Sequence, residues 1–110
     1  MGKKDILKTK SILFELFKNK NISIDKIIIF GSYARGKEQS DSDIDVMVIS
    51  RDFRGKDIFQ KVAMARGVHS GLVSRIKRPV DLLYYSDKEW DKGSSIIINT
   101  AKNEGLIFHS

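Results

Sequence analysis

The sequence has no cysteine, a single proline and only two histidines among its 110 residues. Without thiols, the chain can form neither a disulfide framework nor a thiolate metal site. His69 and His109 are too few and too far apart in sequence to suggest a zinc site. No long apolar run follows the charged N-terminus, so we predict neither a signal peptide nor a membrane span, and we expect a cytoplasmic protein.

Length, composition and charge bound the class of protein. A chain of 110 residues predicts one domain, 1–110, and 41% hydrophobic with 31% charged residues is typical of a folded protein. The net charge is +6, but the basic residues are scattered and only Arg75, Lys77 and Arg78 form a tight group. Scattered charge is typical of a solvated surface, so nucleic acid is not expected as a direct substrate.

Helical and strand patterns alternate along the chain and predict an α/β fold. Three short apolar runs, 25–30, 44–49 and 80–85, predict strands of a small mixed sheet of three to four strands. Helical spacing predicts helices over about 5–19 and over 94–103. It also predicts a helix over about 56–76, whose middle is weakened by Gly67 and Gly71. The Ser86-x-x-Glu89 capping box predicts the start of a further helix.

The residues that indicate chemistry lie in 30–36 and 42–46, Phe-Gly-Ser-Tyr-Ala-Arg-Gly and Ser-Asp-Ile-Asp-Val. Asp43 and Asp45 are two positions apart at the start of a strand, so their side chains should project from the same face. Two adjacent carboxylates are stabilised by a divalent cation between them, and oxygen ligands favour Mg²⁺ or Mn²⁺.

The neighbouring strands are expected to complete this site. If strand 25–30 pairs antiparallel with strand 44–49, Gly31 and Ser32 lie beside Asp43, where Gly31 permits close approach and Ser32 can hold phosphate oxygens. A helical crossover should make strand 80–85 parallel to strand 44–49 and bring Asp81 level with the other two acids. Three converging carboxylates can hold two metal ions about 3.5–4 Å apart, which indicates phosphoryl or nucleotidyl transfer.

The spacing Gly31-Ser32, ten residues, Asp43-Ile44-Asp45 resembles the signature of the minimal nucleotidyltransferase (MNT) family of the DNA polymerase β superfamily. Asp81, in Val-Asp-Leu, matches that family's third carboxylate. The resemblance implies a polymerase β-like fold in which Asp43, Asp45 and Asp81 are catalytic and bind Mg²⁺, two ions being expected. It also implies that Gly31 and Ser32 bind the triphosphate of ATP.

Arg35 has two alternative roles, and His69 is the other side chain that needs an interpretation. Arg35 is one helical turn from Ser32 and could clamp the triphosphate, or it could neutralise Asp43 or Asp45 when metal is absent. His69 is interpreted as a structural or partly exposed side chain.

The MNT resemblance also implies a partner, because members of this family often occur with a HEPN-domain toxin. We expect transfer of AMP to a hydroxyl of such a toxin, in a hetero-oligomer, with no membrane involved. Asp81 is the expected general base. The small domain leaves little room for an acceptor pocket of its own, which favours an acceptor presented by another chain. The alternatives are an antitoxin that neutralises by binding alone, or transfer to a small molecule such as an aminoglycoside.

Overall fold

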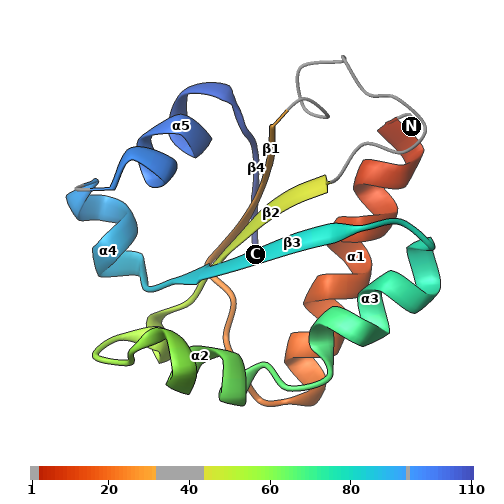
Figure 1. Ribbon diagram of the computed structural model, residues 1–110, viewed down its shortest axis with the longest axis horizontal. Coiled ribbons are helices and arrows are strands. Elements are labelled where there is room, and N and C mark those ends of the chain that lie inside the picture. The colour runs from red at the N-terminus through yellow and green to blue at the C-terminus, as the bar shows by residue number, and fades with distance from the viewer. Residues whose placement is uncertain (1–2, 32–43, 94) are drawn as a thin grey trace.

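The computed structural model describes residues 3–31, 44–93 and 95–110, and its centre is a mixed sheet (Figure 1). The four strands are β1 (Lys26–Phe30), β2 (Ile44–Ile49), β3 (Val80–Tyr85) and β4 (Leu106–His109), in the order β3-β2-β1-β4. β1 pairs antiparallel with both β2 and β4, whereas β2 and β3 are parallel. The expected mixed sheet and the directions of its three expected strands are therefore confirmed.

Helices cover both faces of this sheet (Figure 1). The chain forms α1 (Lys3–Asn19), the short 3-10 helix η1 (Arg51–Phe53), α2 (Ile58–Met64), α3 (Val68–Ile76), α4 (Asp87–Lys92) and α5 (Ile96–Glu104). α1 and α3 pack side by side on one face, while α4 and α5 pack on the other. None of the described helices combines the length and apolarity that a bilayer span requires.

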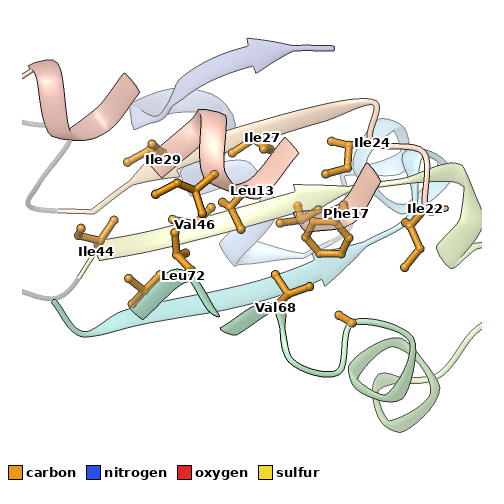
Figure 2. Close-up of a cluster of buried hydrophobic side chains, with 14 of the residues drawn as sticks. Leu13, Phe17, Ile22, Ile24, Ile27, Ile29, Ile44, Val46, Val68 and Leu72 are labelled. Atoms are coloured by element: carbon orange, nitrogen blue, oxygen red, sulfur yellow. The ribbon is translucent and has the colours of Figure 1, made fainter. Parts of the chain in front are cut away.

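The core between the sheet and α1 is drawn in Figure 2, where Leu13, Phe17 and Leu72 meet strand side chains. Ile44 and Val46 of β2 point into this core, whereas Met47 and Ile49 point into the second core under α4 and α5. Alternation along β2 therefore directs every odd-numbered residue, Asp45 included, toward the face that α4 and α5 cover.

The predicted helical stretch over 56–76 is divided into two helices at Gly67, one of the two glycines expected to weaken it. α2 ends at Met64, and α3 begins after Gly67, whose φ is 86°. Apolar residues recur at helical spacing on both sides of this break, but Ile58 and Val62 are 67% and 53% exposed while Leu72 is buried. The break at Gly67 lets α2 turn independently, so its apolar residues do not continue the buried face of α3.

The capping box that starts α4 is confirmed. The Ser86 hydroxyl accepts from the Glu89 backbone N–H at 3.1 Å, and the Glu89 carboxylate accepts from the Ser86 N–H at 2.9 Å. Together these bonds satisfy two backbone donors at the helix start. They also fix the direction in which the chain leaves β3.

β4 was not predicted from the sequence. It is four residues long and pairs with β1 immediately after Gly105, which ends α5. A methyl group at Gly105 would overlap the side chain of Ile28, so glycine is needed for the chain to turn from α5 onto β1. A strand this short gives little periodic signal, and its pairing depends on that tertiary contact.

Candidate functional site

Two carboxylates lie side by side where β2 and β3 begin. Asp45 and Asp81 are direct partners in the parallel register of these strands, and Asp45 is also paired with Phe30 at the end of β1. Neighbouring strands are about 4.8 Å apart, and residues in register project from the same face. Asp45 is half-buried and Asp81 is exposed. This end of the sheet therefore concentrates negative charge next to solvent.

Gly31 lies directly against Asp45. Its φ is +89°, a conformation that residues with a side chain rarely adopt. A methyl group at this position would collide with Asp45 Oδ2. The backbone at the end of β1 can thus approach the carboxylate only because position 31 is glycine.

His69, on α3, reaches the same end of the sheet. Its Nε2 is 2.7 Å from the carbonyl oxygen of Val80, the residue before Asp81. A carbonyl can only accept, so Nε2 carries the proton. His69 also lines a groove of about 620 Å³ together with Asp45 and Asp81. The structural interpretation of His69 is thus supported, although no local pattern in the sequence indicates that it would adjoin the acids.

Three of the six predicted site residues can be placed: Gly31, Asp45 and Asp81 come together at one end of the sheet. Ser32, Arg35 and Asp43 lie outside the described residues. Within the described ranges, no group of three or more His, Asp or Glu side chains could hold a metal ion. The donors that are placed, two adjacent carboxylates beside a glycine backbone, are nevertheless of the kind that suits Mg²⁺.

Carboxylates at the other end of β3 are paired with cations. Arg54 donates to both oxygens of Asp87, and this hydrogen bonding lowers the pKa of Asp87 to about 2. The buried ammonium of Lys61 donates to Glu89 at 2.7 Å. Burial opposes ionisation of Glu89, but hydrogen bonds from Lys61 and Ser86 outweigh it and lower the pKa.

Comparison with known proteins finds solved structures of similar fold. A toxin–antitoxin complex with AMP-PNP has a TM-score of 0.66 at 20% identity, covering 92% of this chain and 73% of that one. A tri-AMPylated Shewanella oneidensis HEPN toxin in complex with an MNT antitoxin gives 0.58 at 18%, covering 94% and 72%. A Sulfolobus solfataricus protein described as a nucleotidyltransferase gives 0.59 at 25%, covering 98% and 88%.

These structural similarities show a shared fold, and the sequence shows the family. Among curated proteins, no sequence matches this chain significantly. The family model of the nucleotidyltransferase domain matches residues 8–103, which is most of the chain. The acids in register at Asp45 and Asp81 therefore lie in a recognised type of catalytic domain. This chain belongs to the nucleotidyltransferase domain family.

Proposed function

We propose that this protein transfers AMP from ATP to a hydroxyl group of a partner protein, a HEPN-type toxin, and thereby silences it. The observation that carries the proposal is the pairing of Asp45 with Asp81 beside Gly31 in a chain of the nucleotidyltransferase family. Further support comes from similar folds in a toxin–antitoxin complex with AMP-PNP and in a tri-AMPylated HEPN toxin with its MNT antitoxin.

The roles of the site residues follow from their chemistry. The proposed ligands of Mg²⁺ are Asp43, Asp45 and Asp81. When bound there, the ion would neutralise negative charge on the triphosphate. Gly31 and Ser32 are proposed to bind the triphosphate, because the glycine leaves room for the backbone to approach it.

The reaction is a displacement at the α-phosphorus of ATP. The acceptor oxygen forms a new P–O bond, the bond between the α-phosphorus and its bridging oxygen to the β-phosphate breaks, and pyrophosphate leaves. Asp81, the more exposed of the two acids, is proposed to take the proton from the acceptor hydroxyl. Catalysis of this kind depends mostly on positioning and on charge stabilisation.

The acceptor hydroxyl is proposed to belong to another chain. We propose that residues 1–110 are one minimal domain, whose acceptor comes from the partner. Each AMP added to a HEPN-type toxin would bring negative charge and bulk. Like-charge repulsion would then keep RNA phosphates away from the modified toxin.

The test is the intact mass of a HEPN-domain toxin from the same organism, after co-expression with this chain. Wild type should add one or more AMP units, and Asp81→Asn should add none. Asp87→Asn is the matched control, because it makes the same chemical change at the far end of β3 and should modify the partner normally. If the partner is neutralised with no mass gain, the protein acts as a binding antitoxin and the proposed transfer is wrong.

A further inference from the structure

β3 forms an open edge of the sheet. Within the described residues it pairs only with β2, through a ladder in which Ile44 N–H bonds to Pro79 and Ser50 N–H bonds to Tyr85. In a parallel ladder with these bonds, the N–H and C=O groups of Leu82 and Tyr84 point away from β2. They form a short row of backbone donors and acceptors that face outward.

This edge runs along the floor of a groove whose lining is mostly apolar. Three adjoining hollows of about 620, 310 and 430 Å³ all border Val62 and Tyr84. The walls carry large apolar side chains that are unusually exposed: Phe59 is 83% exposed, Ile58 67%, Val62 53% and Ile97 37%. Phe59 and Val62 come from α2, whereas Ile97 comes from α5 on the other face of the sheet. A strand edge between two apolar walls is the geometry that accepts an added strand.

The charges of the groove indicate which kind of polymer fits it. Among the described residues, the hollow nearest the site is lined by Asp45 and Asp81 and by no Lys or Arg. The other two hollows are lined by Lys56, Lys61 and Arg66 together with Asp57 and Glu89, so charges of both signs are present there. A polyanion would be repelled beside Asp81, since nucleic-acid sites depend on cations that contact phosphates. A neutral or basic polypeptide is instead complementary, because its backbone can pair with the edge of β3 and its apolar side chains can contact Val62 and Ile97.

We infer that an extended segment of the acceptor protein docks as an additional strand on β3, with apolar side chains between α2 and α5, and carries its hydroxyl toward Asp81. This inference rests on the proposed transfer to a protein hydroxyl and adds the mode by which that acceptor binds. A residue opposite Asp81 on an added strand would have its Cβ about 5 Å from that of Asp81.

His69 limits how far such a strand can pair. Its Nε2–H already bonds to the outward carbonyl of Val80. The ladder is therefore restricted to Leu82 and Tyr84, and the docked segment must leave the sheet edge beside Val80. That exit adjoins Asp81, so the residues that flank the paired segment on this side are the ones presented to the site.

The direct test is residue-resolved amide hydrogen exchange of the full chain, alone and with the HEPN-domain toxin used for the mass measurement. The Leu82 and Tyr84 amides should exchange readily in the free protein and at least tenfold more slowly in the complex. The Leu83 and Tyr85 amides, which point toward β2, should be protected in both states. Amides of β4, at the opposite edge of the sheet, should not change.

A pair of lysine substitutions tests the apolar wall. Val62→Lys places a charge in the groove and should weaken partner binding at least tenfold, with the MgATP response unchanged. Ile107→Lys is the matched control on the opposite edge strand, where the wild-type residue is 39% exposed, and should bind normally. If Val62→Lys does not fold, Phe59→Lys at a more exposed position serves the same purpose.

The outcomes separate docking from catalysis. If the mass of the partner increases but Leu82 and Tyr84 gain no protection and Val62→Lys binds normally, the docking mode is wrong and the proposed transfer stands. If a complex protects these amides without any mass gain, docking is supported and transfer is wrong. Absence of a complex overturns the docking mode. Slow exchange of both amides in the free protein, accompanied by dimerisation, also overturns it, because a second copy then occupies the edge.

Discussion

Polar side chains at the two ends of the β2–β3 strand pair differ in their hydrogen bonding. Beyond the last residue of β2, the buried Ser50 hydroxyl donates to the Ser23 carbonyl and accepts from Asp52 N–H at 3.0 Å. At the first residues of these strands, the carboxylate of Asp81 receives no hydrogen bond or ion pair from any described residue, although it adjoins Asp45. The first arrangement holds the fold together, while the second leaves carboxylate charge for a ligand to neutralise.

The largest expected effect is on the rate of AMP transfer, which should depend on the site end of the strand pair and not on the opposite end. Asp81→Asn should reduce AMP transfer by about 10³-fold, because loss of a metal ligand removes several kcal/mol of charge stabilisation from the transition state. Glu89→Gln, at the opposite end of β3, should leave the rate nearly unchanged. Initial rates of pyrophosphate release measure both. Equal losses in the two variants would show that the ends do not differ in function.

The stability of the far end depends on Glu89. Glu89→Ala should lower the free energy of unfolding by about 2 kcal/mol, because it removes a helix cap and leaves the buried Lys61 ammonium without its carboxylate. Glu89→Gln keeps the cap acceptor and should lose less. Urea unfolding distinguishes the two variants. A loss of equal size in both would assign the whole effect to the charge.

At the site end, stability depends on Gly31. Gly31→Ala should cost about 1–2 kcal/mol, because alanine is strained at φ +89° and its methyl group collides with Asp45. The same variant should bind MgATP more weakly. Gly55→Ala is the matched control: its φ is also positive, at +70°, but a methyl group there meets nothing within 4 Å. If both variants lose equal stability and bind MgATP equally well, the contact with Asp45 is unimportant.

The smallest expected effect concerns the exposed Arg54–Asp87 pair. Because Arg54 lowers the folded-state pKa of Asp87 to about 2 from an ordinary value of 3.8, the pair stabilises the fold above pH 3.8. That contribution should disappear as the pH falls through about 2. The difference in melting temperature between wild type and Asp87→Asn should therefore be small at pH 7 and vanish near pH 2. A difference that does not change with pH would contradict this assignment.

Much of the site was predictable because it depends on strand order. The apolar runs predicted β1, β2 and β3, and the helical connection between β2 and β3 required them to be parallel, which brings Asp81 beside Asp45. The open groove was not predictable, since helical spacing alone cannot tell that α2 exposes Ile58 and Val62. That exposure results from the break at Gly67 and from the packing of neighbouring helices.

The central claim is that the end of the sheet with Asp45 and Asp81 binds a metal–nucleotide complex. The most direct measurement is the melting temperature of wild type, Asp81→Asn and Asp87→Asn, each with and without millimolar MgATP. Without ligand, Asp81→Asn should unfold within about 0.5 kcal/mol of wild type, because Asp81 is exposed. With MgATP, wild type and Asp87→Asn should be stabilised and Asp81→Asn should not. Equal stabilisation of all three proteins, or none of wild type, would contradict the account.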